Sequence, residues 1–284
     1  MRKKKYPAYI ISVDNLAFGG TGKTPLTLML VEELLARKFP VAIVTRGYRS
    51  AYERDGLRVG PEHTAAQVGD EAALLKRRTP DSGVYIGRCR ACSIERAVED
   101  GYRFVVLDDG LQSTDIKKNF SIMLVKRSHP YYYLRNFRFY SQREDVVLYL
   151  DENETLHEPG SYRFTFTGFF DSNGNQVEVG ASGIAGFSAL GDNARFKKDL
   201  EQYHCLGFKG FPDHHAYDAR DLKALDDFRR NLNAEYLVCT EKDFVKIQPN
   251  SIGEIPLIFV KNSIKLSVDL MGQILDDAKA KGFV

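Results

Sequence analysis

The sequence predicts an α/β protein built on a parallel sheet with helices on both faces, with a second, smaller α/β domain after it. Short apolar runs alternate with amphipathic stretches of helical period, which is the pattern of βαβ units. A glycine-rich loop stands between the first apolar run and the first helical stretch. Polar motifs follow several later apolar runs, and parallel sheets bind ligands beyond the carboxyl ends of their strands.

The first part of the chain supplies the predicted larger sheet. Its apolar runs are short enough to be buried strands, and the segments between them have the period of helices. The expected strands are 9–13, 41–45, 83–86, 104–107, 121–125 and 146–150, and the expected helices are 26–36, 67–78 and 91–100. A polar, turn-rich stretch, 49–66, separates the second strand from the second helix.

The pattern changes after about Leu150, where the chain becomes polar and rich in turns. Residues 162–170 alternate and Asp171–Asn175 is a strong turn, which predicts a hairpin at a boundary or hinge. We therefore expect a first domain over 1–158 and a smaller one over 159–284, whose final helix is free to pack back on the first. In the second domain the expected strands are 183–189, 205–211, 236–240 and 257–260, and the expected helices are 193–202, 218–231 and one from 268.

The composition is that of an ordinary folded protein, with 43% hydrophobic and 27% charged residues. The net charge of +2 gives no argument for or against nucleic acid. No apolar run reaches the roughly 18–20 residues that span a bilayer. The four cysteines (Cys89, Cys92, Cys205 and Cys239) are scattered in a chain without a signal peptide, which fits a reducing cytoplasm. Cys89 and Cys92 have zinc-compatible spacing, but no second pair follows, so we expect one helix face without metal.

The glycine-rich loop has the layout of a phosphate-binding P-loop: strand, glycines, Lys-Thr, helix. Glycines let backbone N–H groups approach a polyphosphate, and the helix N-terminus adds unpaired donors. Lys23 can reach the β- and γ-phosphates, and the Thr24 hydroxyl can bind Mg²⁺. Ala17 stands where the usual pattern has glycine, so a structural turn is the alternative. The expected nucleotide-binding residues are Gly19, Gly20, Thr21, Gly22, Lys23 and Thr24.

Two acidic pairs are candidates for the same site. Asp108 and Asp109 follow a buried strand, which is the Walker B position that holds Mg²⁺. The alternative is a solvated strand end with a turn at Gly110. Asp70-Glu71 opens a predicted helix, where capping is the common role of acidic residues. Gln112 could orient a phosphate, a metal-bound water or the acceptor.

The segment Phe211–Tyr217 holds two of the six histidines. Asp213 beside His214 and His215 could orient an imidazole as a general base. Metal binding is the rival interpretation, and a helix entry with Asp218 as cap is the third. The residues alone leave the three open.

Two stretches suggest an anionic partner. Residues 128–143 interleave six aromatic side chains with three arginines, which suits an anionic amphiphile, single-stranded nucleic acid or an ordinary half-buried segment. Residues 2–5 are basic, which fits a solvated terminus or contact with an anionic membrane surface.

Taken in order, the motifs resemble those of the tetraacyldisaccharide 4′-kinase family, the lipid A 4′-kinases of Gram-negative bacteria. The resemblance runs from about Pro7 to Lys246, and its last three motifs are far more specific than a P-loop alone. The motifs are Ile11–Asn15 leading into Gly19–Pro25, Arg46–Tyr48, Gly69–Glu71, Asp108–Gln112, Phe211–Tyr217 and Thr240–Asp243.

The resemblance implies ATP-dependent phosphorylation of the 4′-hydroxyl of a tetraacylated glucosamine disaccharide 1-phosphate, in lipid A biosynthesis. It implies ATP and Mg²⁺ as cofactors, and a P-loop domain joined by a hinge to a smaller domain, with the active site between them. The expected place is cytoplasmic, at the inner face of the cytoplasmic membrane. We expect a monomer without a nucleic-acid partner.

Carried over residue by residue, the resemblance gives each motif a role. Asp70 pairs with a histidine of the 214–215 pair to activate the sugar hydroxyl, and His214 is preferred to His215. The remaining assignments are Asp109 and Gln112 to catalysis, Asn15, Arg46 and Tyr48 to substrate, Lys23 to phosphates, and Thr24, Asp108, Asp109 and Glu71 to metal.

Some positions depart from the family pattern. Asp14 stands where the family usually has glycine, which places a negative charge near the phosphate site, and Ser113 stands where a histidine usually follows. Members usually begin with a membrane-associated helix, whereas here the first strand begins within ten residues of Met1. The aromatic-basic stretch 128–143 occupies the place of the usual Pro-Ala-Gly-x-Leu-Arg-Glu segment.

Two other functional interpretations are alternatives to a sugar kinase. One is a P-loop NTPase that acts as a switch without a small-molecule acceptor, and the other is a degenerate relative that binds nucleotide or lipid without catalysis. A switch needs no base outside the nucleotide domain, so the histidine segment favours the kinase.

Overall fold

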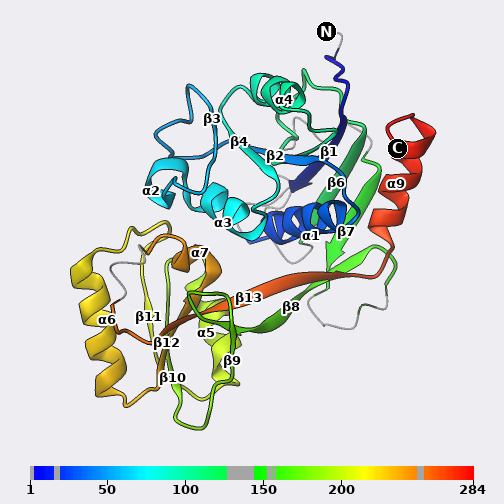
Figure 1. Ribbon diagram of the computed structural model, residues 1–284. Coiled ribbons are helices and arrows are strands. Elements are labelled where there is room, and N and C mark those ends of the chain that lie inside the picture. The colour runs from blue at the N-terminus through cyan, green and yellow to red at the C-terminus, as the bar shows by residue number, and fades with distance from the viewer. Residues whose placement is uncertain (1–2, 16–19, 127–143, 152–155, 157, 248–252) are drawn as a thin grey trace. The chain divides into compact units, whose positions relative to one another are not determined.

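The computed structural model describes residues 3–15, 20–126, 144–151, 156, 158–247 and 253–284. The chain forms two compact units, whose elements are labelled in Figure 1. The first comprises residues 1–63, 67–165 and 263–284, and the second 64–66 and 166–262. The chain leaves the first unit within strand β8 (Ser161–Phe170) and returns to it within β13 (Leu257–Leu266).

The first unit is built on a mainly parallel sheet. Its central strand β1 (Tyr9–Asn15) pairs in parallel with β5 (Phe104–Asp108) on one side and β6 (Phe120–Val125) on the other. The order across the unit is β8, β7 (Val146–Leu150), β6, β1, β5, β2 (Val41–Thr45), β4 (Gly83–Ile86) and β3 (Leu57–Arg58), and β3 is antiparallel to β4. Because β1, β2, β4 and β5 run the same way, their carboxyl ends meet at one edge.

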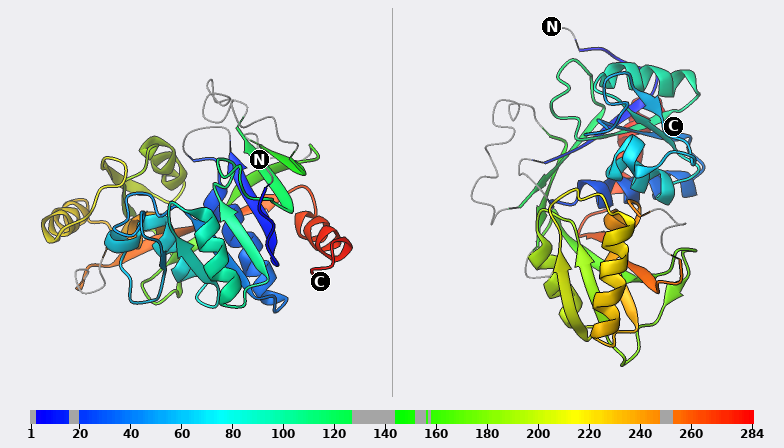
Figure 2. Two further views of the ribbon diagram at one scale, coloured as in Figure 1. Left: turned by 90° about the horizontal axis from the view of Figure 1, so that it is seen from above. Right: turned by 90° about the vertical axis from the view of Figure 1, so that its left-hand side faces the viewer.

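Helices cover both faces of this sheet, because successive side chains of a strand point to opposite faces. Ile11 and Val106 pack with α1 (Lys23–Ala36), α3 (Asp70–Arg78) and α9 (Leu270–Ala280), whereas Ile10 and Val105 pack with α4 (Arg90–Glu99). The right-hand view of Figure 2 shows α4 (teal) on one side of the sheet and α1 and α3 (blue and cyan) on the other.

The second unit is a smaller parallel sheet with its own core. The strand order is β11 (Cys205–Gly210), β10 (Ile184–Ser188), β12 (Tyr236–Thr240) and β13, all parallel. One face packs against α6 (Ala219–Asn231) and α7 (Glu241–Phe244), and the other against α5 (Asn193–Glu201). The end of β8 forms a hairpin with β9 (Gln176–Val177) around the turn 171–175.

The structure confirms the predicted fold class, a parallel α/β sheet with helices on both faces. It differs in detail from the predicted elements. The polar stretch 49–66 contains the short strand β3, and Gly69 interrupts the helix predicted over 67–78, leaving α2 (Ala65–Val68) and α3. β13 continues six residues beyond the apolar run 257–260, and in that extension only Ile264 is buried, which gives too weak a hydrophobic pattern to predict a strand.

Within the described ranges, no helix combines the length and the apolar character that a crossing of the bilayer requires.

Candidate functional site

The P-loop lies between β1 and α1 in the first unit. Gly22 caps α1 with a left-handed backbone (φ 91°), which glycine adopts without strain. Thr21 is held from two sides: Asn15 Nδ2 donates to its hydroxyl at 2.5 Å, and the Tyr162 hydroxyl donates to its carbonyl at 2.6 Å. Thr21 is therefore held in place, and Lys23 and Thr24 lie in the first turn of α1. Gly19, the first residue of the predicted phosphate-binding set, lies outside the described residues.

The acidic pair lies beside the P-loop strand, because β1 and β5 are neighbours and Val13 is in register with Asp108. Asp108 is only 3% exposed, and its Oδ1 has no hydrogen-bond partner among the residues that the structure describes. Burial raises the pKa of Asp108 to about 7; the charge of Glu71 adds to the rise, and that of Lys23 opposes it. Asp109 has a left-handed backbone (φ 63°), an uncommon conformation for a non-glycine residue.

Arg90 is a member of this site that the sequence did not reveal. Its side chain is half-buried and interacts electrostatically with Asp108 and Asp109. Its Nη1 donates to the Gly87 carbonyl at 2.5 Å, while its buried Nε has no partner in the described part of the chain. Burial lowers the pKa of Arg90. A lone arginine at the start of a helix carries no motif, so only the fold could bring it to these carboxylates.

The donor set fits a magnesium ion bound together with phosphate. Mg²⁺ is usually held by one or two carboxylates, a hydroxyl, water and substrate phosphates rather than by an all-protein cage. Among the described residues, no three His, Cys, Asp or Glu side chains form a ready-made metal cluster. Asp108 offers a buried oxygen that no described residue bonds, and Thr24 offers a hydroxyl at the start of α1. The residues therefore fit such an ion.

Asp14 serves the loop that carries Asp109. Its carboxylate accepts from the Ser12 hydroxyl at 2.7 Å and from the Leu111 backbone N–H at 2.6 Å. Burial raises the pKa of Asp14 to about 6, and the charge of Lys118 opposes that rise. The aspartate at this position thus anchors the turn after β5, and its charge is compensated locally.

Asp70 and Glu71 open α3 directly after Gly69, whose φ of 88° breaks the helical path. Asp70 is 9% exposed, and its Oδ1 accepts from the Glu71 N–H at 3.0 Å. The helix cap itself is Gly69, which makes no side-chain capping bond. Asp70 therefore lies in the first turn of the helix, and Glu71 interacts electrostatically with Asp108.

Arg46 and Tyr48 lie in the loop that follows β2. Arg46 Nε pairs with Glu53 Oε1 at 2.7 Å, and its guanidinium lies 5.9 Å from the centre of the Tyr48 ring. Tyr48 is 53% exposed, so its ring is accessible to solvent. Gln112 is exposed in the turn after β5.

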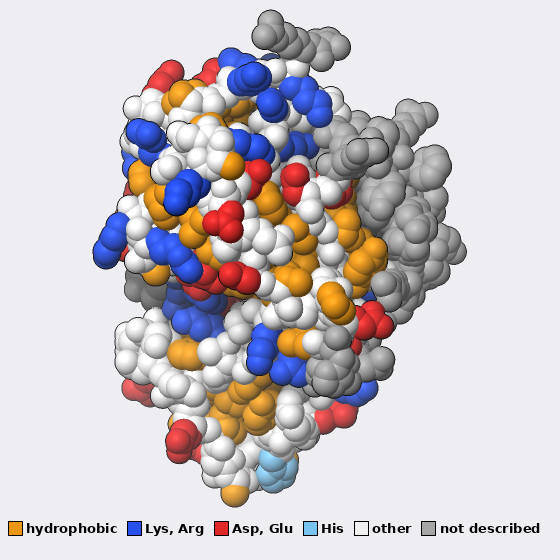
Figure 3. Space-filling model, turned by 90° about the vertical axis from the view of Figure 1, so that its right-hand side faces the viewer, with side chains coloured by type: hydrophobic (Ala, Val, Ile, Leu, Met, Phe, Trp, Pro, Cys, Tyr) orange, Lys and Arg blue, Asp and Glu red, His pale blue; other side chains and the backbone are white. Residues whose placement is uncertain are grey.

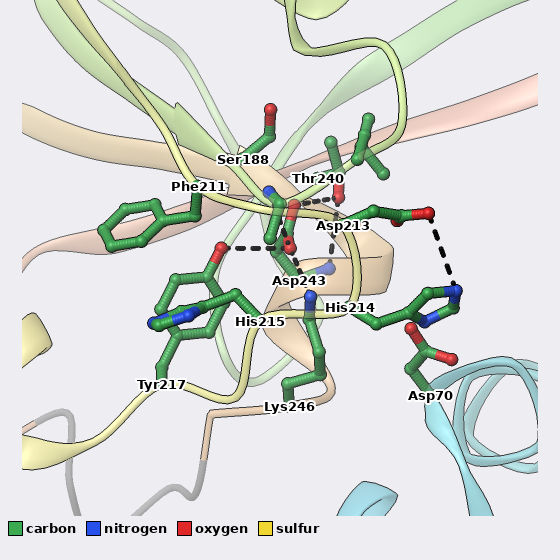
Figure 4. Close-up of polar contacts among 12 residues, drawn as sticks. Asp70, Ser188, Phe211, Asp213, His214, His215, Tyr217, Thr240, Asp243 and Lys246 are labelled. Atoms are coloured by element: carbon green, nitrogen blue, oxygen red, sulfur yellow. Dashed lines mark hydrogen bonds and ion pairs between the residues drawn. The ribbon is translucent and has the colours of Figure 1, made fainter. Parts of the chain in front are cut away.

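The histidine loop, residues 211–217, follows β11 in the second unit (Figure 4). His215 Nε2 pairs with Asp221 Oδ2 at 2.8 Å, and its ring stacks on Phe211 at 4.8 Å. His214 has a left-handed backbone (φ 61°), and its Nε2 lies 3.7 Å from Asp213 Oδ2. His215 is thus fixed as part of the helix entry, whereas His214 is paired only loosely with Asp213.

Asp218, the third interpretation of this segment, does cap α6. Its carboxylate accepts from the N–H groups of Arg220 and Asp221, both at 2.8 Å. The Asp218 N–H donates in turn to the Asp221 carboxylate at 3.2 Å, which completes a capping box. The capping interpretation is therefore correct for Asp218.

Cys89 and Cys92 are joined in a disulfide at the start of α4. They share the first turn of a helix, as expected, but the disulfide between them was not predicted. The spacing allows the bond because residues three apart lie on one helix face. Cys205 and Cys239 form no disulfide within the described part of the chain.

The structure brings together part of the predicted site within the first unit. Asn15, Thr21, Lys23 and Asp108 meet where β1 and β5 end, with Glu71 in electrostatic reach. His214 and His215 are brought together with acidic partners within the second unit. The aromatic-basic stretch 128–143 lies outside the described residues.

Comparisons with known proteins agree with these motifs. The profile of a family described as "Tetraacyldisaccharide-1-P 4'-kinase" matches residues 1–279. A tetraacyldisaccharide 4′-kinase of Desulfotalea psychrophila is 30% identical, with 99% of this chain and 90% of the relative covered. One of Anaeromyxobacter dehalogenans is 29% identical, with 96% and 82% covered.

A solved structure has a similar fold. The crystal structure of LpxK from Aquifex aeolicus in complex with ATP superposes with a TM-score of 0.78 at 24% identity. The match covers 99% of this chain and 90% of that one.

Proposed function

This chain belongs to the tetraacyldisaccharide-1-P 4′-kinase family, and from that premise we propose the role of each part of the site. The reaction is ATP-dependent transfer of a phosphoryl group to the 4′-hydroxyl of a tetraacylated glucosamine disaccharide 1-phosphate. The chain is a kinase, a phosphotransferase with an alcohol group as acceptor.

One observation carries the assignment of the nucleotide site. A buried acceptor, Asp108 Oδ1, and a buried donor, Arg90 Nε, both lack partners in the described chain, and their side chains interact electrostatically. Buried polar atoms without partners are costly, so a folded protein rarely keeps two in one place without a ligand. A phosphate with its bound cation would satisfy both atoms: the cation would bind Asp108 Oδ1, and a phosphate oxygen would accept from Arg90 Nε.

The P-loop residues then hold the nucleotide. The N–H groups at the start of α1 face the phosphates, and Lys23 neutralises charge on the transferred group. Arg90 supplies a second positive charge near the phosphates. Phosphoryl transfer depends on positioning and charge stabilisation rather than on covalent chemistry of the protein.

We assign Thr24, Asp108 and Asp109 to a bound Mg²⁺, with Glu71 in support. When bound, this ion would neutralise charge on the phosphate oxygens. Asp109 in its strained conformation and Gln112 in the next turn would orient the groups around the transferred phosphate.

The acceptor hydroxyl needs a base, and we assign that role to His214, oriented by Asp70. We prefer His214 to His215, whose Nε2 pairs with Asp221 at 2.8 Å within the entry of α6. A positioned base contributes about 10²–10⁴-fold to such a step. Asn15, Arg46 and the exposed Tyr48 are assigned to the substrate.

We further propose that the protein acts as a monomer in the cytoplasm, peripheral to the inner face of the membrane that holds its lipid substrate. Lys3, Lys4 and Lys5 are exposed at the start of the described chain. Lys and Arg side chains gather at the end of the first unit shown at the top of Figure 3. Clustered cations near a membrane are attracted to anionic lipids. Binding to anionic lipid vesicles that weakens with added salt would support this placement.

The experiment measures transfer of label from γ-labelled ATP to the tetraacyl disaccharide 1-phosphate in detergent. Lys23→Ala should lower the rate at least about 10²-fold, because it removes charge stabilisation from the transferred group. Lys279→Ala, an exposed lysine on α9, is the matched control and should keep the wild-type rate. Thr24→Ser should keep more activity than Thr24→Ala, because it retains the hydroxyl. Equal rates for wild type and Lys23→Ala would contradict the assignment.

A further inference from the structure

We propose that Tyr217 and Asp243 are positioning residues for the reaction: the buried carboxylate of Asp243 holds the Tyr217 hydroxyl and thereby fixes the histidine loop around His214. The inference rests on the proposed role of His214 as base, and it adds the residues through which that base is held. The motif Thr240–Asp243 has no part in the chemistry described above, and this role accounts for it.

The Asp243 carboxylate joins three segments of the second unit (Figure 4). It is fully buried, and its Oδ1 accepts from the Ala189 N–H at 3.1 Å and from the Tyr217 hydroxyl at 3.0 Å. Lys246 Nζ pairs with the same oxygen at 2.7 Å. Oδ2 accepts from the Thr240 hydroxyl at 2.6 Å. A buried charge that is fully satisfied in this way rigidifies the segments that satisfy it.

Tyr217 is locked by its ring as well as by its hydroxyl. The ring contacts Phe187 and Phe211, with centroids 5.4 Å and 5.3 Å away, and Lys246 Nζ lies 5.1 Å from its centre. Burial, and then the charge of Asp243, raise the pKa of Tyr217 well above its usual range. The hydroxyl therefore stays protonated and donates to Asp243 at any working pH.

The other end of the histidine loop is fixed by backbone bonds. The Phe211 N–H donates to the Ser188 carbonyl at 2.8 Å, and Asn193 Nδ2 donates to the Phe211 carbonyl at 2.8 Å. The loop thus has one anchor at Phe211 and one at Tyr217. Both anchors lie beyond the carboxyl end of β10 and therefore fix the position of the loop relative to that strand.

His214 lies between the two anchors in a strained conformation. Its φ of 61° is unfavourable for a residue with a Cβ and persists only where the surroundings enforce it. In Figure 4 the rings of His214 and His215 point to opposite sides of the loop. Anchoring at Tyr217 therefore keeps His215 against Asp221 and keeps the His214 ring on the opposite side of the loop. Loss of the anchor would let His214 relax toward ordinary φ values and leave its working position.

The test is a Tyr217→Phe variant, which deletes one hydroxyl and keeps the ring contacts. We expect kcat to fall about tenfold, the scale of one misplaced catalytic contact, while KM for ATP stays unchanged. Tyr203→Phe is the matched control, because Tyr203 is in the same unit and packs against Phe166 and Phe169. It should keep the wild-type kcat. Thr240→Ala removes another bond to the same carboxylate and should give a smaller loss of the same kind.

A double-mutant cycle separates positioning from general loosening of the fold. His214→Asn removes the base while suiting a left-handed backbone. If Tyr217 acts through His214, Tyr217→Phe lowers kcat in wild type but has no further effect in His214→Asn. Equal fold losses in both backgrounds would overturn the positioning role alone. A wild-type kcat in His214→Asn would overturn the base assignment and this inference with it.

Discussion

Two buried aspartates, one in each unit, behave in opposite ways. Asp108 is 3% exposed, has an oxygen without a partner in the described chain, and has its pKa raised to about 7 by burial. Asp243 is fully buried and has four partners, including the ammonium of Lys246 at 2.7 Å. Asp108 is the last residue of the parallel strand β5, and Asp243 lies in α7, which begins directly after the parallel strand β12.

The difference distinguishes a carboxylate suited to binding a ligand, Asp108, from a carboxylate that holds the surrounding segments in place, Asp243. An unsatisfied carboxylate costs stability, and proteins keep such groups where function requires them. A satisfied carboxylate stabilises the segments around it and contributes to function through their position.

Asp108→Asn should abolish most kinase activity while leaving the fold intact. It removes the charge that faces the phosphate-bound cation, so we expect a loss of about 10²–10³-fold in kcat. Asp276→Asn, an exposed aspartate on α9, is the matched control. Activity comes from labelled phosphate transfer and stability from urea unfolding. A strongly destabilised Asp108→Asn variant would contradict this distinction, because Asp108 would then stabilise the fold as Asp243 does.

Asp243→Asn should act chiefly on stability. It leaves Lys246, whose side chain is 8% exposed, as a buried charge without its carboxylate. Breaking a buried ion pair by changing one partner costs about 3–5 kcal/mol. Urea unfolding measures the change, and Asp227→Asn on α6, which is exposed, should shift it by less than about 0.5 kcal/mol. Equal midpoints for the two variants would show that the network around Asp243 contributes little.

The pH dependence of stability should reveal Asp108 directly. Because its folded pKa is raised to about 7, the folded state binds a proton that the unfolded state has already lost. Stability without nucleotide should therefore fall as pH rises from about 5.5 to about 8, by about 2 kcal/mol more in wild type than in Asp108→Asn. Asp14 and Glu144, whose pKa values burial raises to about 6 and about 7, contribute in both proteins and cancel. Parallel stability curves would contradict the raised pKa.

Reduction of the Cys89–Cys92 disulfide should have the smallest effect. The bond closes a very short loop, and the chain-entropy model gives at most about 2 kcal/mol for such a loop. The difference in unfolding midpoint with and without reductant measures it. Cys89→Ser keeps a good helix cap and should match the reduced protein, while Cys205→Ser should leave the effect of reductant unchanged.

Much of the fold follows from the sequence because its signals are local. The strand–glycine–helix order of the P-loop, the apolar run before Asp108 and the turn at 171–175 each report their structure within a few residues. Their alternation then allows few arrangements other than a parallel sheet with helices on both faces. Short strands such as β3 carry too few residues to show a period.

The parts of the site that escaped prediction depend on contacts between distant segments. Arg90 interacts electrostatically with Asp108 and Asp109 because α4 packs against β2 and β4, an arrangement that no spacing in the sequence reveals. Tyr217 reaches Asp243 across 26 residues. The disulfide was missed for a different reason: the spacing of Cys89 and Cys92 is visible, but their redox state depends on surroundings that a sequence does not describe.

The most direct test of the account is to locate the phosphate on the product. Wild-type protein is incubated with ATP and the tetraacyl disaccharide 1-phosphate, and phosphorus and proton NMR identify the modified hydroxyl. We expect a bisphosphate that carries the transferred phosphate at the 4′ position, and no such product from Lys23→Ala or His214→Asn. ATP hydrolysis without a phosphorylated sugar, or transfer to another position, would contradict it.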